Sequence, residues 1–365
     1  MITLLGELVN MDSGSYDKAG VDRVGARLSQ FFVEHDIVIR TERHAKFGDA
    51  IFAEVGTSGG GNRPIVLMGH RDTVFPKGEA GLRPFRIEGA RAYGPGVADM
   101  KAGLVMNAYV LAAFRRFGGA PAPLLGLITS DEEIASPSSR PVIERTAKSA
   151  LAVLNSEPGR PSGNVITGRK GGIFLAIEVR GKAAHSGGSF KEGISAIGEI
   201  AHKIVALHRL TDLEAGVTVN VGLLKGGQSV NTTAPLAEAE VDLRYVRPQQ
   251  RDDLLEKVAR IVEVSTVAGA TASFGIKGEF VPLIETEASR SVMAAYAAAS
   301  GELGYAVGGE FSGGCADSGF TALSGAPTLC GIGPIGGRAH TADEYVELDS
   351  LVPRAKALAL TILRL

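Results

Sequence analysis

Histidine and carboxylate side chains follow apolar segments of this chain, and these residues have the chemistry of a catalytic or metal-binding site. Pro64–Met68 is an apolar run typical of a buried strand, and it leads directly into Gly69-His70-Arg71-Asp72. A histidine there lies at the carboxyl edge of a sheet, where open α/β folds bind their ligands. Asp72 is placed to hold the second imidazole nitrogen, which improves the first as a metal ligand. By itself, the His-x-Asp pair is equally compatible with ordinary polar residues at a strand end.

Two further apolar runs end in acidic residues. Pro123–Thr129 is followed by Ser130-Asp131-Glu132-Glu133, and Leu151–Leu154 is followed by Asn155-Ser156-Glu157. Consecutive carboxylates repel one another unless a cation or protons offset their charge, although a solvated acidic loop is the alternative. Because three apolar strands each end in acid or imidazole groups, we expect these groups to converge on one site.

Two more candidates lie in loops. Asp99 lies in a glycine-rich loop before a helix expected to begin near Lys101, where an N-cap aspartate is the plain alternative. His340 lies in Arg338-Ala339-His340 near the carboxyl end. A mixed set of imidazole and carboxylate ligands suits zinc, cobalt or manganese, and it is not the ligand set of a thiolate-bound structural site. Two imidazoles and three carboxylates are more ligands than one tetrahedral zinc needs. They fit two ions that share one carboxylate and lie about 3.5–4 Å from each other.

The elements that position these residues indicate two domains in a chain of 365 residues. The middle of the chain carries alternating apolar strands and two amphipathic helices in the order β-α-β-β-α-β, a split βαβ pattern. We therefore predict an α/β fold. Its main domain has a mixed sheet flanked by helices over 1–172 and 280–365, and a ferredoxin-like domain is inserted over 173–279.

Composition limits the classes of partner. The formal net charge is −2, with 45% hydrophobic and 21% charged residues, which gives no reason to expect nucleic acid or a membrane surface. No apolar run is expected to reach the length of a membrane span. Two cysteines are too few for a disulfide framework, so the cytoplasm is the expected location.

The glycine run Gly56–Gly61 lacks the ending of a phosphate-binding loop and is interpreted as a hairpin turn. A nucleotide-dependent oxidoreductase would fit the α/β pattern, but it needs Gly-x-Gly-x-x-Gly between a strand and a helix, and the sequence has no such arrangement. A binding protein without catalysis is the other alternative. It usually lacks one or more ligands, and here the candidate set is complete.

Four motifs, in this order, resemble the di-zinc aminoacylase/carboxypeptidase family. They are Gly69–Val74, Gly94–Lys101, Asp131–Arg140 and Ala339–Tyr345. The chain is most similar to bacterial glutamate carboxypeptidases of the folate-cleaving type, through Pro84–Gly89, Gly181–Gly187 and Asp242–Tyr245. The same family includes acetylornithine deacetylases, succinyl-diaminopimelate desuccinylases and aminoacylases.

The resemblance implies a role for each candidate. Two Zn²⁺ ions per subunit, replaceable by Co²⁺ or Mn²⁺, would be bound by His70, Asp99, Glu133, Glu157 and His340. Asp99 would bridge the ions, followed by a cis peptide to Met100, and Asp72 would orient His70. Glu132 would be the general base that takes a proton from the bridging water and passes it to the leaving amine.

The resemblance also implies which residues contact the substrate. His185 would stabilise the oxyanion in the partner subunit of a homodimer formed through the inserted domain, although an ordinary loop histidine is the alternative. Asn231, Arg244, Gly313 and Gly314 match positions that hold the substrate, and an arginine fork suits its carboxylate. The expected activity is hydrolysis of a peptide or N-acyl amino acid next to a free carboxylate, with C-terminal glutamate favoured. A deacylase of the acetylornithine or succinyl-diaminopimelate type is the alternative.

Overall fold

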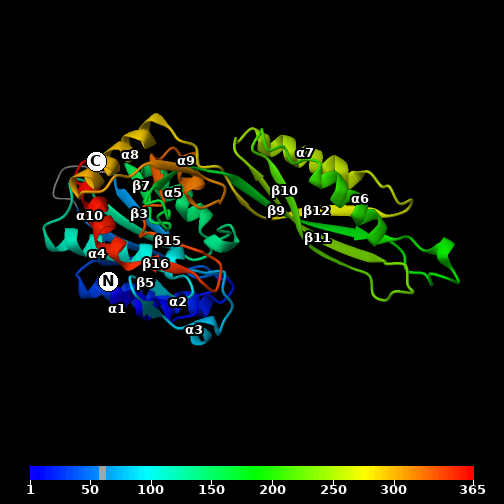
Figure 1. Cartoon of the computed structure of the whole chain (residues 1–365), viewed down its shortest axis with the longest axis horizontal. Coiled ribbons are helices and arrows are strands. Elements are labelled where there is room, and N and C mark those ends of the chain that lie inside the picture. Colours follow the sequence, from blue (N-terminus) through cyan, green and yellow to red (C-terminus); the bar gives the residue numbers. More distant parts are fainter. Residues whose placement is uncertain (57–62) are drawn as a thin grey trace. The chain divides into compact units, whose positions relative to one another are not determined.

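The computed structural model describes residues 1–56 and 63–365, which divide into two compact units (Figure 1). The first unit comprises Met1–Gly168, Leu283–Ser312 and Ala316–Leu365. The second comprises Arg169–Pro282 together with Gly313–Cys315. The second unit thus interrupts the sequence of the first. Gly313 and Gly314 belong to the second unit, whereas the sequence placed them in the first.

The first unit is built on an eight-stranded mixed sheet with the order β1-β2-β6-β3-β7-β14-β8-β13. Its strands are β1 (Val38–Glu42), β2 (Ala50–Val55), β3 (Ile65–His70), β6 (Leu124–Thr129), β7 (Ala152–Asn155), β8 (Val165–Arg169), β13 (Gly309–Ser312) and β14 (Thr328–Cys330). Every residue of β3 is buried, as expected for a central strand covered on both faces. A smaller sheet, β15-β16-β5-β4, is formed by β4 (Arg86–Glu88), β5 (Arg91–Tyr93), β15 (Gly336–Gly337) and β16 (Tyr345–Glu347).

The helices of the first unit lie around its sheets, and several of them pack directly on the large one (Figure 1). They are α1 (Ile2–Val9), α2 (Lys18–Glu34), α3 (Glu79–Leu82), α4 (Ala102–Arg116), α5 (Arg140–Ser149), α8 (Glu287–Glu302), α9 (Ser318–Leu323) and α10 (Leu351–Ile362). The α/β fold expected from the sequence is therefore confirmed. The segment Val97–Arg116 is long and apolar enough to span a membrane by length and composition alone. Its most apolar window is 83% buried inside the unit, as in a core helix.

The helices α1 and α2 are separate, and Asp17 caps α2 by accepting a hydrogen bond from Gly20 N. The hairpin turn expected at Gly56–Gly61 falls almost entirely outside the described residues. The flanking strands β2 and β3 are separated by β6, so they do not form a β-hairpin.

The second unit has the ferredoxin-like order predicted from the alternating strands. Its elements are β9 (Gly171–Arg180), α6 (Ala196–His208), β10 (Thr218–Gly226), β11 (Leu236–Tyr245), α7 (Gln250–Glu263) and β12 (Thr271–Phe280). They form an antiparallel sheet with the order β10-β11-β9-β12. One face of the sheet is buried: its apolar side chains, such as Ile173 and Val241, form a core with α6 and α7.

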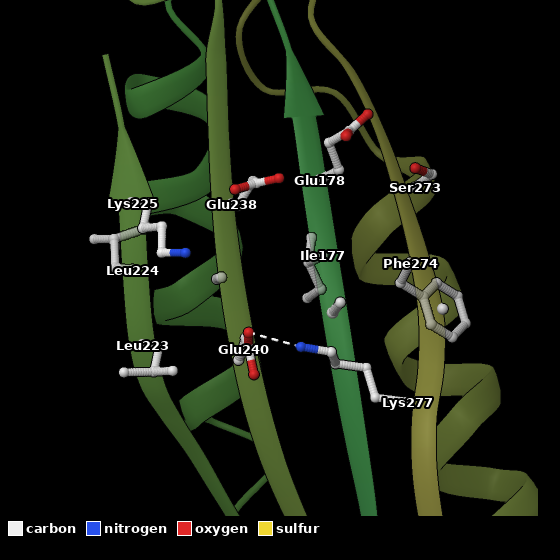
Figure 2. Close-up of a pocket in the computed structure, with 13 residues that line it drawn as sticks. Ile177, Glu178, Leu223, Leu224, Lys225, Glu238, Glu240, Ser273, Phe274 and Lys277 are labelled. Atoms are coloured by element: carbon white, nitrogen blue, oxygen red, sulfur yellow. Dashed lines mark hydrogen bonds and ion pairs between the residues drawn. The ribbon is translucent and has the colours of Figure 1, made fainter. Parts of the chain in front are cut away.

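The opposite face of this sheet is polar. Figure 2 shows Glu178 of β9 beside Glu238 of β11, and farther along β11 Glu240 is paired with Lys277 of β12 at 2.8 Å. The pocket on this face is lined by charged side chains from four strands, and it contains none of the residues singled out in the sequence.

Candidate metal centre

Three neighbouring parallel strands carry the acid and imidazole groups to one edge of the large sheet. β3 lies between β6 and β7, and His70 at its end is paired with Thr129 at the end of β6. Glu132 and Glu133 follow β6, and Glu157 follows β7. Parallel strands end at the same edge, so this topology brings together residues that are distant in sequence.

The ligand atoms form two clusters that share Asp99. In one cluster, His70 Nε2 lies 3.2 Å from Asp99 Oδ1 and 3.6 Å from Glu157 Oε1. In the other, His340 Nε2 lies 3.3 Å from Asp99 Oδ2 and 3.2 Å from Glu133 Oε2. Within each cluster the ligand atoms are within 4.8 Å of one another. The five residues expected to bind metal are therefore adjacent.

These residues fit a pair of divalent cations. Each oxygen of Asp99 faces a different imidazole, the arrangement needed for a carboxylate that bridges two ions. Glu133 Oε1 is buried and has no hydrogen-bond partner among the described residues. A bound cation would supply the interaction that this oxygen lacks. The donors are imidazole nitrogens and carboxylate oxygens, a set that zinc, cobalt and manganese accept.

Asp72 links the two ligand-bearing strand ends and is fully buried. His70 Nδ1 lies 3.1 Å from the Asp72 carbonyl oxygen and 3.3 Å from its Oδ1, so the ring proton is held there and Nε2 faces the cluster. The Asp72 carboxylate also accepts hydrogen bonds from the backbone N–H groups of Glu132 and Glu133, at 3.2 and 3.1 Å. One carboxylate thus positions a ligand on β3 and the acidic pair after β6.

Glu132 lies beside the clusters but belongs to neither. Its side chain is buried, and Oε2 is 4.0 Å from His70 Nε2. Burial raises the pKa of Glu132 well above its ordinary value, and the charges of Glu157 and Asp317 raise it further, whereas His70 opposes the shift. A carboxylate with a raised pKa is better suited to accept a proton and return it than one with an ordinary pKa.

The electrostatics of the clusters reflect their density of carboxylates. Burial alone would lower the pKa of His70, but hydrogen bonds to Asp72 and Asp99 outweigh it and raise that pKa well above its ordinary value. Hydrogen bonds to Asp99 and Glu133 raise the pKa of His340 to about 10. The negative potential that favours protonated imidazoles also attracts divalent cations.

Glu344 is a functional residue that the sequence reasoning missed, although it lies inside the fourth motif. Its buried carboxylate accepts hydrogen bonds from the backbone N–H groups of Gly96, Ala98 and Asp99, at 2.8–3.0 Å. Burial raises the pKa of Glu344 to about 7 against the effect of these bonds. Glu344 therefore holds the turn that carries Asp99, and the Asp99–Met100 peptide is cis, as the resemblance implies.

Asp317 is a second buried acid that the sequence reasoning did not single out. It accepts a hydrogen bond from Ser136 Oγ at 2.5 Å, and burial raises its pKa to about 8. Ser136 belongs to the third motif, so this contact ties the acidic loop after β6 to the start of α9. The sequence signal for this contact was the Ser-x-x-Ser spacing in the third motif. It indicates that the serines make polar contacts but does not identify the residues they contact.

His185 and Asn231 lie together in the second unit. Ser186 N donates to Asn231 O at 2.9 Å, and His185 forms a bridge with Thr232. His185 is exposed, and its Nδ1 accepts hydrogen bonds from Gly187 N and Gly188 N at 3.1 and 3.0 Å. A neutral ring that accepts at Nδ1 carries its proton on Nε2, which is then available to donate to an oxyanion.

Arg244 lies at the opposite end of the same unit. It pairs with Asp242 through Nε at 2.7 Å and Nη2 at 3.0 Å, and Nη1 is 2.7 Å from Cys315 Sγ. Gly313 and Gly314 precede Cys315, and Gly314 O accepts from Arg169. Burial raises the pKa of the Cys315 thiol, which supports its interpretation as a packing residue and not a nucleophile.

Comparisons with known proteins agree with the fold and the metal clusters. The family model described as peptidase family M20/M25/M40 matches residues 66–364. Carboxypeptidase G2 of Pseudomonas sp. (strain RS-16) is 28% identical over 98% of this chain and 87% of its own length. Acetylornithine deacetylase of Myxococcus xanthus is 29% identical over 70% of each chain.

Solved structures show the same fold. The M20 family metallo-carboxypeptidase Sso-CP2 of Sulfolobus solfataricus has a TM-score of 0.81 at 17% identity, covering 99% of this chain and 98% of that one. The YXEP protein of Bacillus subtilis, described as a dinuclear metal-binding peptidase, has a TM-score of 0.70 at 17% identity, covering 100% and 96%.

The fold and the shared-carboxylate centre define a metal-dependent hydrolase. The chain belongs to peptidase family M20/M25/M40.

Proposed function

We propose that this M20 metallohydrolase is a zinc-dependent carboxypeptidase-like enzyme. It cleaves the amide bond between an acyl group and an amino acid with a free carboxylate, with C-terminal glutamate preferred. The observation that carries the proposal is the Asp99 carboxylate facing both imidazoles, with buried Glu132 beside the two clusters. A cytoplasmic location fits Cys315 and Cys330, which are not joined by a disulfide.

Each residue of the centre has a role in the proposed reaction. His70 and Glu157 would hold one ion, Glu133 and His340 the other, and Asp99 both. When bound, the two ions supply Lewis acidity that polarises the scissile carbonyl and acidifies a water molecule. Glu132 accepts a proton from that water and delivers it to the leaving amine, because burial raises its pKa and makes the carboxylate a better proton acceptor.

Arg244 is proposed to bind the substrate carboxylate. A guanidinium has five N–H donors, and three are engaged by Asp242 and Cys315 within the described residues. One donor on Nη1 and one on Nη2 remain, and such a pair suits a carboxylate. Asp242 keeps the fork in a defined orientation, so little freedom is lost when the substrate binds.

The homodimer is proposed because His185 and Arg244 are too far apart to act together in one chain. His185 and Asn231 lie beside the Arg180 end of β9, whereas Arg244 pairs with Gly172 at the other end. The ten residues of β9 span about 30 Å. A site that uses both histidine and arginine therefore needs the inserted domains of two chains.

Exposed apolar residues support an interface on this unit. β10 is an edge strand, and Leu223 and Leu224 on it are 58% and 57% exposed. Ile197 and Val205 lie two turns apart on α6, which packs on β10, and are 44% and 54% exposed. An open strand edge beside an apolar helix face is a surface that a second copy would cover.

Acetylornithine deacetylases among the relatives, at 26–30% identity, favour a second candidate function. In that case the substrate is a small N-acyl amino acid such as an acetylated diamino acid. A panel of N-acyl glutamates, C-terminal glutamate peptides and N-acetylornithine separates the two candidates. We expect the glutamate compounds to have the higher kcat/KM.

The variant Glu132→Gln tests the mechanism. We expect it to keep both metal ions by elemental analysis and to lose about 10²- to 10⁴-fold in kcat, because the proton acceptor is removed while the ligands remain. The exposed Glu214→Gln serves as the matched control and should leave kcat unchanged. Undiminished turnover by the Glu132→Gln enzyme would contradict the role of this residue.

A further inference from the structure

His340 is the most exposed of the five expected metal ligands. Its side chain is 53% exposed, and it lies in the loop between β15 and β16. By contrast, His70 ends the buried strand β3 and is 2% exposed, so the sheet itself fixes its position. The place of the His340 imidazole next to Asp99 and Glu133 therefore depends on what holds its loop.

The backbone of this loop has a conformation that residues other than glycine rarely adopt. Arg338 has a φ of 55° and His340 a φ of 64°, both in the left-handed region. Such a conformation is costly and persists only where surrounding contacts hold it. Within the loop, Thr341 N and Thr341 Oγ1 both donate to Arg338 O, at 3.2 and 2.7 Å. Contacts from outside the loop add to these.

Arg83 makes such contacts from a segment far away in the sequence. Its Nη1 donates to Ala342 O at 3.0 Å and to Thr341 O at 3.4 Å, so it binds two carbonyl groups of the loop. Its Nε donates to Glu79, and the guanidinium carbon lies 4.7 Å from the centre of the Phe75 ring. The ion pair and the stacking on the ring fix the orientation of the planar guanidinium. The carbonyl groups are therefore held at a defined place.

The segment that presents this guanidinium is itself anchored on both sides. The Asp12 carboxylate accepts hydrogen bonds from Gly78 N and Ala80 N, each at 2.8 Å, at the start of α3. On the other side, Phe85 N donates to Asn10 Oδ1 at 2.8 Å. These three hydrogen bonds attach the segment to the turn that follows α1. The arginine thus acts from a rigid base.

The contacts of Arg83 concern one of the two ligand clusters. It binds the loop of His340 directly. It also stacks on Phe75, which lines a mainly apolar pocket of about 560 Å³ that Glu133 borders too. His340 and Glu133 form one cluster with Asp99. Among the described residues, the hydrogen bonds of Arg83 reach neither ligand of the other cluster, His70 or Glu157.

We propose that Arg83 is a positioning residue for the metal ion held by Glu133 and His340. It acts by holding the loop that carries His340, and it contacts no ligand side chain. The inference rests on the proposed two-ion centre and assigns this arginine to one of the two ions. Its removal should therefore weaken the binding of one ion and leave the other in place.

Calorimetric titration of the metal-free chain with Zn²⁺, in the presence of a competing chelator, measures the two affinities. The wild-type protein should bind two ions. Arg83→Ala should weaken one site about 10- to 100-fold, the usual effect of removing a group that orients a ligand, and change the other less than twofold. Arg83→Lys keeps the charge and a donor group, so it should recover part of the lost affinity. The matched control Arg145→Ala removes an exposed arginine that pairs with Glu42 at 2.6 Å, and should change neither affinity.

A double-mutant cycle identifies which ion depends on Arg83. Adding Arg83→Ala to His340→Ala should cause no further loss of Zn²⁺ affinity, because the loop no longer carries a ligand. Adding it to Glu157→Ala, which disables the other cluster, should still weaken the remaining site about 10- to 100-fold. A general loosening of the protein would not distinguish between these two backgrounds.

The outcomes separate this inference from the proposed function. Two ions bound with wild-type affinity by Arg83→Ala would overturn the role of Arg83, while the two-ion centre stands. Equal weakening of both sites, or a further loss in the His340→Ala background, would also overturn it. If the wild-type protein binds fewer than two ions, the proposed two-ion centre is wrong and the inference about Arg83 fails with it.

Discussion

Asp99 is the residue on which both halves of the metal centre depend. Its two oxygens lie 3.2 and 3.3 Å from different imidazoles, so a small rotation of the carboxylate would weaken both clusters together. The orientation comes from the backbone of the Gly96–Asp99 turn, which Glu344 holds through three N–H groups. Metal binding is therefore expected to depend on a residue that itself contacts no ion.

Glu344→Ala tests this dependence. The change leaves three backbone N–H groups without their acceptor, so the turn loosens and metal affinity should fall about 10- to 100-fold. Competition with a chelator, followed by elemental analysis, measures the affinity. Glu344→Gln keeps one acceptor oxygen and should lose less. Wild-type affinity in Glu344→Ala would show that the turn holds its shape without this carboxylate.

At the scale of elements, Lys101 joins the amino-terminal segment to the turn before α4. Its ammonium is buried and donates to Met11 O at 2.9 Å and to Pro95 O at 3.5 Å. Burial lowers the pKa of Lys101 from 10.5 to about 8, against the opposing charges of Glu344 and Asp12. A charged lysine in this position is costly, so stability should depend on pH above neutrality.

The direction in which stability changes with pH follows from how many protons the folded and the unfolded protein bind. Between pH 8 and 10.5 the unfolded chain holds the proton that the folded protein has released, so stability rises with pH across this window. The contribution of Lys101 to the free energy of unfolding should increase by about 2 kcal/mol from pH 8 to pH 10.

Urea denaturation of metal-free protein at pH 8 and pH 10 measures this increase. The same pair of experiments on Lys101→Met gives the background from all other groups, and the difference between the two proteins isolates Lys101. A difference that stays constant or falls with pH would contradict the burial argument.

At the scale of the whole molecule, the proposed active site draws on two chains. His185 and Asn231 lie at one end of the inserted domain's sheet and Arg244 at the other. His185→Ala and Arg244→Ala should each be inactive as homodimers. After mixing with subunit exchange, heterodimers regain one intact site, so activity should return to about one quarter of the wild-type level.

The matched control mixes His185→Ala with Asn231→Ala. These residues lie at the same end, so each site of the heterodimer still lacks one of them and activity should not return. Recovery in both mixtures, or in neither, would contradict the assignment of His185 and Arg244 to different chains.

Much of the fold was predictable because the signals are local. The period-2 burial of β9 and the apolar stripes of α6 and α7 follow directly from the order of residue types, so the inserted domain could be placed from the sequence. The pairing of Ser15 N with Thr73 O, which joins the segment between α1 and α2 to the loop after β3, crosses the fold and has no local signal. Lys203 likewise donates to three carbonyl oxygens near the end of α7, a contact that spacing does not reveal.

The sequence by itself determined the candidate metal ligands, because three of them follow apolar strands and the other two, Asp99 and His340, lie in motifs that resemble those of the family. Only the tertiary structure decided which oxygen of Asp99 faces which imidazole, that Glu344 holds the Asp99 turn, and that Arg244 already pairs with Asp242. The tertiary structure also decided that His185 and Arg244 lie at opposite ends of the inserted domain's sheet, and that an apolar pocket lies beside Glu133. These features join segments far apart in the chain, and their geometry depends on strand order and side-chain packing that residue types alone do not specify.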